Sequence, residues 1–230
     1  MSANTIDTVE VSPEVQANAS IIWMHGLGAA GEDFLPITEQ FNLPQNHSIR
    51  FIFPNAPVKS ITVNNGMKMR AWYDIKCFNS LNCDTNNQED HDGILESQVI
   101  INNLIRREMD QGINPNRIIL AGFSQGGAMA LHTGLRFDNQ LGGVICLSGY
   151  LPWSNFLPQQ KNSSNQHTPI FMAHGLFDPV VPFYLGKKSY DVLKSLKYTA
   201  TWHTYPMQHT IIDKEITDLG KFFKKILGYQ

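Results

Sequence analysis

The chain has 230 residues, which suits one domain with a sizeable core, and we expect residues 1–230 to form a single domain with a polar N-terminal segment, 1–18. The net charge is −2, and the sequence contains no long run of charges of one sign. Both features argue against nucleic acid and anionic lipid as partners. No apolar run approaches the roughly 18 residues of a transmembrane helix. The N-terminus lacks the pattern of a secretory signal, so we expect a cytoplasmic protein.

Strand-like and helix-like patterns alternate along the chain. Nearly continuous apolar runs, typical of strands buried on both faces of a parallel sheet, predict strands. They occur at residues 20–24, 49–53, 117–121, 143–147, 169–173 and 198–205. Helices are predicted at residues 93–110, 125–136, 183–196 and 211–227, and the first of them places Ile94, Ile101, Leu104 and Ile105 on one stripe. The alternation predicts an α/β architecture with a mostly parallel sheet.

Two polar stretches interrupt this alternation. Residues 76–92 and 154–168 are rich in polar residues, and we interpret both as surface loops. The cysteines are Cys77, Cys83 and Cys146. The first two could pair within a loop, but free thiols in a reducing cytosol are favoured. Because no two cysteines have CxxC spacing, we expect no zinc site.

The run GFSQGGAMA places Ser124 between a predicted strand and a predicted helix. G-x-S-x-G in that context is typical of a nucleophile elbow, a sharp strained turn that exposes a reactive serine. Gly122 and Gly126 would leave room for the turn, and Gly127 would let the helix pack near its strand. The alternative is that Ser124 only caps the helix. A phosphate-binding loop is disfavoured because GxxxxGK[ST] is absent.

A serine hydroxyl needs a general base, and the base needs an orienting carboxylate. In hydrolases with this elbow they follow in the order Ser, Asp or Glu, His. Asp178 lies just past the strand at 169–173, although a turn aspartate before proline is the alternative. His209 lies in the loop after the last predicted strand. His25 and His174, which precede glycines at strand ends, are interpreted as structural residues or as supports of the catalytic groups.

A tetrahedral intermediate needs two backbone N–H donors for its oxyanion. One normally belongs to the residue after the nucleophile, here Gln125. The other comes from an early strand-to-helix loop, and the run WMHGLGAAGEDF is such a candidate. Leu27, between two glycines, is the predicted donor. The alternative is a glycine-rich turn without a catalytic part.

Several segments together resemble the acyl-protein thioesterase / phospholipase–carboxylesterase family, and most of all its bacterial carboxylesterases. They run from about residue 20 to the C-terminus and read HGLGAAGEDF, PNAPVKSITVNNGMKMRAWYDI, GFSQGGAMAL, LSGYLP, HGLFDPVVP and YPMQH. The chain departs from the family pattern at Ala29, where an acidic residue is frequent, and at Gln208, where Gly or Pro is frequent. Neither departure removes a candidate catalytic group.

The resemblance implies an α/β-hydrolase fold without a large cap, and a serine hydrolase that cleaves carboxylic esters or thioesters through an acyl-enzyme. It supports the triad Ser124, Asp178 and His209, and implies no metal or cofactor. Small acyl esters, lysophospholipids or S-acylated proteins are the implied substrates. An apolar acyl groove is implied beside the serine, with candidate lining residues Leu27, Trp72, Leu151 and Trp153. For Trp72, a core aromatic is an equal alternative.

Two other functions stay open at this point. A serine peptidase would share the elbow and the triad order, but the chain lacks the additional domain that such enzymes use to select peptides. A non-catalytic binding module is the second alternative, disfavoured because all three triad candidates are present. The apolar residues 151–157 either contact a membrane surface transiently or, as we favour, cover a groove. A monomer and a homodimer are both compatible with the sequence.

Overall fold

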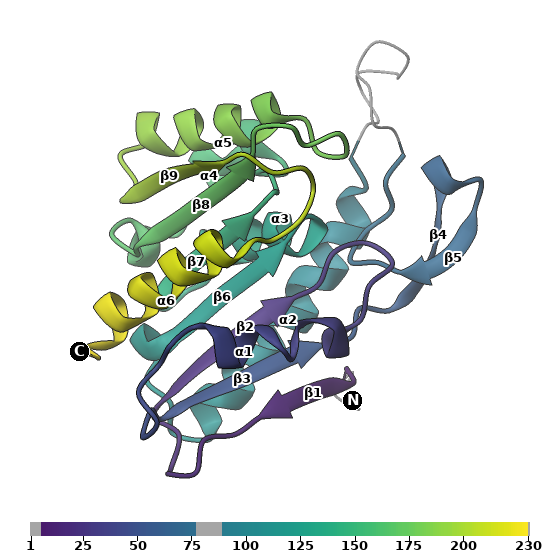
Figure 1. Ribbon diagram of the computed structural model, residues 1–230. Helices are drawn as coiled ribbons and strands as arrows, with labels where there is room; N and C mark the ends of the chain where they lie inside the picture. Colours follow the sequence, from purple (N-terminus) through teal and green to yellow (C-terminus); the bar gives the residue numbers. More distant parts are fainter. Residues whose placement is uncertain (1–5, 77–88, 230) are drawn as a thin grey trace.

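The computed structural model describes residues 6–76 and 89–229. Figure 1 shows a central sheet with helices on both of its faces. Its strand order is β1-β3-β2-β6-β7-β8-β9, and all neighbouring pairs are parallel except β1 with β3. The strands are β1 (Thr8–Val11), β2 (Ala19–Met24), β3 (Ile49–Pro54), β6 (Ile118–Phe123), β7 (Gly143–Leu147), β8 (Ile170–Gly175) and β9 (Ala200–Tyr205). The predicted α/β architecture with a mostly parallel sheet is confirmed.

Helices cover the sheet on both faces, and a small hairpin lies beside it (Figure 1). The α-helices are α1 (Ile37–Gln40), α2 (His91–Asp110), α3 (Gln125–Gly134), α4 (Leu157–Gln160), α5 (Phe183–Ser195) and α6 (Asp213–Leu227). Short 3₁₀ turns occur at Gly31–Phe34, Thr62–Asn64, Pro115–Arg117, Ser154–Phe156 and Ser163–Asn165. The hairpin pairs β4 (Val58–Ile61) with β5 (Met67–Arg70) in antiparallel register.

Alternate residues of each central strand enter two separate hydrophobic cores. On β2, Ile22 and Met24 pack with α2, α3 and α5 on one face, whereas Ile21 and Trp23 pack with α1 and α6 on the other. This division follows from the period of two in a strand. Burial on both faces explains why the strands read as continuous apolar runs.

The parallel strands all end at one edge of the sheet, and the loops that follow them gather there. The arrowheads of β2, β6, β7 and β8 point the same way in Figure 1. In open α/β sheets this edge carries the ligand and catalytic groups. The segments containing Leu27, Ser124, Asp178 and His209 follow β2, β6, β8 and β9 respectively, so all four predicted elements lie at this edge.

The polar N-terminal segment contributes β1, a short edge strand that pairs with β3. Two expectations about polar loops need correction. The segment 154–168 contains three short helical elements rather than an irregular loop. Buried Asn165 anchors its C-terminal part, because its side chain donates to the carbonyls of Phe137 and Asn139 at 2.9 Å. In the segment 76–92, α2 already begins at His91, after the Asp90 cap.

Residues 77–88, which include Cys77 and Cys83, lie outside the described part of the chain. Cys146 is a buried free thiol on β7. None of the helices in residues 6–76 and 89–229 combines the length and the apolar character needed to cross a membrane.

Candidate active site

Ser124 lies on a sharp turn between β6 and α3. Its backbone angles, φ 56° and ψ −119°, are strained for a residue with a side chain. The serine is nearly buried, with 8% of its surface exposed. Its carbonyl accepts the Ala128 N–H at 3.0 Å and so begins the helix, whereas its own side chain makes no capping bond. The alternative that Ser124 is an ordinary helix cap is therefore wrong.

Glycines make this turn possible. A Cβ at Gly126 would overlap the Met24 carbonyl oxygen, and a Cβ at Gly122 would overlap the backbone of Gly126. A Cβ at Gly127 would come within 2.9 Å of the Gly122 carbonyl oxygen and 3.1 Å of the Cys146 sulfur. The strand, the turn and the helix thus approach one another through bare backbone, as the glycine spacing predicted.

Asp178 and His209 meet through a short hydrogen bond. His209 Nδ1 lies 2.7 Å from Asp178 Oδ2, and the carboxylate is fully buried. A carboxylate only accepts, so Nδ1 carries the proton and Nε2 is left free to accept one. The other carboxylate oxygen accepts the N–H groups of Val180 and Val181 at 2.8 and 2.9 Å. These bonds hold the carboxylate in one orientation toward the imidazole.

The loops that carry this pair are tied together by their backbones. Leu176 N–H donates to the Tyr205 carbonyl at 2.9 Å, and Phe177 N–H donates to the Met207 carbonyl at 3.1 Å. Gly175 leaves no space for a side chain at this crossing, because a Cβ there would lie 2.5 Å from the Met207 oxygen. The distance between acid and base is thereby set by the ends of two neighbouring strands.

His174 supports the acid loop from within the core. Its Nε2 donates to the Val181 carbonyl at 2.9 Å and lies 3.5 Å from Asp178 Oδ2. Burial lowers the pKa of His174, so the ring stays neutral beside the carboxylate. This histidine therefore has the structural role that was predicted, and it fixes the turn 178–181.

The Ser124 segment and the His209 loop touch through an aromatic contact. The ring centroids of Phe123 and His209 lie 4.6 Å apart. Phe123 is the residue before Ser124, and His209 is the predicted base. Within the described residues, no hydrogen bond joins Ser124 Oγ to His209. Without substrate such bonds are frequently long, and they shorten in the reacting complex. Phe123 is a contact that sequence reasoning missed, because no motif marks it.

The loop after β2 passes directly beside Ser124. A Cβ at Gly26 would lie 3.3 Å from the Ser124 Cβ. Leu27 follows in this loop and is partly buried, and Gly28, with φ 77°, donates its N–H to the Arg70 carbonyl at 2.8 Å. The structure thus brings the loop that contains Leu27 close to Ser124, which Gln125 follows directly in the sequence.

Three candidate groove residues are buried. Trp72 is fully buried and its indole N–H donates to the His25 carbonyl at 2.9 Å, which favours the core aromatic over the groove wall. Leu151 is 4% exposed and Trp153 8% exposed. The Trp153 ring packs against His91 and His132 on α2 and α3. A substrate-contacting role for Leu27, Leu151 and Trp153 stays a prediction.

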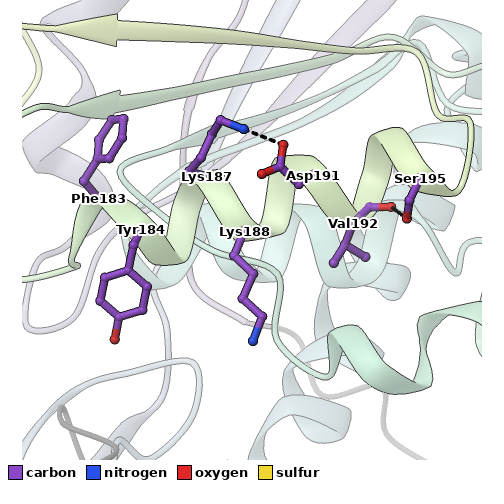
Figure 2. A pocket seen from close by; sticks show the side chains of 7 residues that line it. All are labelled: Phe183, Tyr184, Lys187, Lys188, Asp191, Val192 and Ser195. Carbon is purple, nitrogen blue, oxygen red and sulfur yellow. Dashed lines mark hydrogen bonds and ion pairs between the residues drawn. The ribbon is translucent and has the colours of Figure 1, made fainter.

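An open hollow of about 560 Å³ runs along the outer side of α5. Figure 2 shows Tyr184 and Lys188 on one side of this helix, Phe183 directed toward the strands, and the ion pair of Lys187 with Asp191. The hollow contains none of the predicted site residues. Its walls come from a single helix, so it is a shallow surface rather than an acyl groove.

Known proteins resemble this chain over nearly its whole length. A model of the phospholipase/carboxylesterase family matches residues 5–227. The chain belongs to this family. Acyl-protein thioesterase 1 from Gibberella zeae is 39% identical over 99% of this chain and 98% of its own length. Acyl-protein thioesterase 1 from Emericella nidulans is 41% identical over 91% of this chain and 90% of its own length.

Solved structures of other proteins share the fold of this chain. The crystal structure of Arabidopsis thaliana SOBER1 has a TM-score of 0.84 and 32% identity, covering 92% of this chain and 100% of the other. Zea mays acyl-protein thioesterase 2 has a TM-score of 0.82 and 25% identity, covering 97% and 100%. The Bacillus cereus carboxylesterase, at 16% identity and a TM-score of 0.77 over 98% and 96% of the two chains, shows the fold alone.

Two predictions are confirmed by these comparisons. The fold is that of an α/β-hydrolase, with no large cap in the described residues. The chain is a hydrolase acting on carboxylic esters or thioesters. The roles of individual residues in that activity are the subject of the proposal below.

Proposed function

We propose that Ser124, His209 and Asp178 are the catalytic triad of this hydrolase. The observation that supports it best is the 2.7 Å bond between His209 Nδ1 and the buried Asp178, at the same sheet edge as the strained Ser124 turn. The bond leaves His209 Nε2 as the acceptor for a serine proton. Both features are what acyl transfer needs from a base and a nucleophile.

The reaction has two halves. His209 takes the Ser124 proton as Oγ attacks the acyl carbonyl, and the N–H groups of Leu27 and Gln125 hold the oxyanion. The alcohol or thiol leaves with the proton from His209, and Ser124 keeps the acyl group. Water, deprotonated by His209, then attacks the acyl-enzyme, and His209 returns the proton to Ser124 Oγ as the carboxylic acid leaves. Asp178 keeps the imidazole in the required tautomer throughout.

The proposed substrates are acyl esters and thioesters, including S-acylated proteins and lysophospholipids. Support comes from the relatives named acyl-protein thioesterase, which align over almost the whole chain. The proposed location is the cytoplasm, a reducing compartment where buried Cys146 remains a thiol. We further propose that one domain carries the entire site, as a monomer or a homodimer.

The test is hydrolysis of p-nitrophenyl esters from two to sixteen carbons and of an S-palmitoylated peptide, with Ser124→Ala. We expect activity on both bond types and a loss of at least about 10³-fold in kcat for the variant, because the attacking oxygen is gone. The matched control is Ser148→Ala, a buried serine at the end of the next strand. Full esterase activity in Ser124→Ala would refute the proposal, and cleavage of peptide amides alone would favour the peptidase.

A further inference from the structure

The two proposed oxyanion donors are fastened to one short piece of chain. Residues 70–73, here called the strap, begin at the last residue of β5 and contain Trp72 of the RAWYD motif. On one side the strap binds the loop that holds Leu27, and on the other it binds the side chain of Gln125. These two donors lie about a hundred residues apart in sequence, so nothing local sets their separation.

The first pair of bonds fixes the Leu27 side. The Trp72 indole N–H donates to the His25 carbonyl at 2.9 Å, two residues before Leu27. The Arg70 carbonyl accepts the Gly28 N–H at 2.8 Å, one residue after it. The backbone of Leu27 is therefore held from both ends by the strap. His25 closes the arrangement, because its ring accepts the Ala56 N–H at 3.0 Å and lies 5.5 Å from the Trp72 ring.

The second pair of bonds fixes the Gln125 side. Gln125 Oε1 accepts the Trp72 backbone N–H at 2.8 Å, and Gln125 Nε2 donates to the Tyr73 carbonyl at 2.7 Å. Gln125 is 2% exposed, so neither bond competes with bulk water. A side-chain amide that satisfies one donor and one acceptor on two consecutive residues has a single orientation. The first residue of α3, whose N–H is the proposed donor, cannot rotate away.

The strap is itself anchored in the core. Ser97 Oγ on α2 donates to the Trp72 carbonyl, and Ala71 N–H donates to the Pro57 carbonyl at 3.0 Å. The Tyr73 and Tyr150 hydroxyls share a 2.9 Å hydrogen bond. Groups of Ala71, Trp72 and Tyr73 thus have hydrogen-bond partners elsewhere in the fold. These partners take no part in the proposed reaction, and they determine the position of the strap.

We propose that Trp72 is a positioning residue that sets the distance between the Leu27 and Gln125 N–H donors and so the strength of the oxyanion hole. This inference rests on the proposed function. It gives RAWYD a purpose other than lining the acyl groove. An oxyanion hole works because its donors are already in place when charge develops. Loosening them costs transition-state binding but leaves the ground-state acyl chain where it was.

Trp72→Phe tests the proposal, because it removes the indole N–H and one of the two fused rings but keeps a buried aromatic side chain. We expect kcat for p-nitrophenyl butyrate to fall by about 10- to 100-fold, less than the 10²–10³-fold that loss of a whole donor costs, with KM changed less than about twofold. Affinity for butylboronic acid, whose serine adduct carries a tetrahedral oxyanion, should fall by the same factor as kcat/KM.

Trp23→Phe is the matched control. Trp23 is also fully buried, on β2, and its indole N–H has no partner among the described residues. Its replacement therefore removes a buried tryptophan without removing a hydrogen bond, and kcat and boronate affinity should stay within about twofold of the parent enzyme.

Gln125→Met supplies a second route to the same question, since it removes both side-chain bonds to the strap and keeps the backbone N–H. It should lower kcat and boronate affinity together, as Trp72→Phe does. Near-ultraviolet circular dichroism reports folding, and Gln125→Met decides the outcome if Trp72→Phe does not fold. Ordinary kcat in the folded variants, or a rise in KM with kcat intact, would overturn the strap proposal. Ser124→Ala, assayed beside them, separates this from failure of the triad, because only the latter leaves Ser124→Ala active.

Discussion

Two serines at the ends of neighbouring strands show what makes one of them a candidate nucleophile. Ser124 follows β6 and Ser148 follows β7, and both have positive φ, 56° and 47°. Each N–H extends the sheet ladder to the next strand at 2.8 Å, Ser124 to Leu147 and Ser148 to Ala173. The positive φ and the place at a strand end are thus shared by the two residues.

What differs is what comes after each serine and what faces it. Ser124 leads into the ten residues of α3, whose N-terminus favours negative charge, whereas Ser148 leads into an irregular segment. Ser124 is 8% exposed beside the His209 loop, and Ser148 is wholly enclosed, with no hydrogen-bond partner for Oγ in the described part of the chain. In the proposed mechanism a strained strand end is therefore not sufficient, and the nucleophile also needs the helix N-terminus and the base.

Removing the acid should make Ser124 nearly as inert as Ser148. In Asp178→Asn the amide presents either a donor or a weak acceptor to His209, so the base loses the tautomer it needs. We expect kcat for p-nitrophenyl butyrate to fall by about 10³–10⁴-fold. Asp191→Asn on α5 is the control, since that carboxylate pairs with Lys187 at the surface. A loss below tenfold for Asp178→Asn would place the acid elsewhere.

A histidine in α3, the helix that follows Ser124, should make the stability of the protein depend on pH. Burial, with a smaller contribution from Arg136, lowers the pKa of His132 in α3 from 6.5 to about 3. The unfolded chain takes up a proton below pH 6.5 and the folded chain does not, so stability falls as the pH drops from about 6.5 toward 3.

In His132→Phe this acid sensitivity should shrink. The measurement is the free energy of unfolding in urea at pH 5 and pH 7, for the variant and the parent enzyme. The parent should lose more stability than the variant between the two values. An equal loss in both would show that His132 is not buried in its neutral form.

Strain at the two serines can be compared directly by replacing each with glycine. Ser124→Gly should abolish esterase activity and raise the free energy of unfolding by about 1 kcal/mol, because glycine adopts φ 56° and ψ −119° without cost. Ser148→Gly should give a smaller gain with activity retained. Urea denaturation measures both, and a less stable Ser124→Gly protein would mean that the turn is not strained.

The smallest effect is expected for Ser148→Ala. The hydroxyl it removes is buried without a partner, so its loss exposes no new unsatisfied group. We expect kcat within about twofold and a stability change under about 0.5 kcal/mol. A large loss of activity would mean that Ser148 acts on the site in a way that its burial conceals.

The sequence predicts the parts of this fold that carry strong local signals. All six predicted strands exist. Five of them are buried on both faces, which leaves uninterrupted apolar runs such as IFMA at 170–173, whereas β9 is a partly exposed edge strand. β1, β4 and β5 were not predicted, because VKSI and MKMR are largely exposed and β1 is a short edge strand. Their pairing depends on partners, not on their own composition.

The candidate site likewise has a part that the sequence predicts and a part that it does not. Ser124, Asp178 and His209 were found because a motif and a chain order mark them, and the structure joins Asp178 to His209. The strap was not predicted, since its contacts join backbone groups to side chains far apart in the sequence, and no residue pattern reveals such pairs. Similarly, the anchoring of the segment that ends at 165 depends in part on one buried side chain, Asn165, within a polar run.

The edge strand β1 has a practical consequence for anyone who shortens or tags this protein. Asp7, just before β1, accepts both the N–H and the side-chain amide of Asn55, at 2.8 and 2.9 Å. Asn55 in turn accepts the Gly31 N–H at 2.8 Å, in the turn that follows the Leu27 loop. An affinity tag fused ahead of residue 6 should leave these hydrogen bonds intact. A truncation that removes Asp7 would free Asn55 and, through it, slacken a loop that borders the serine.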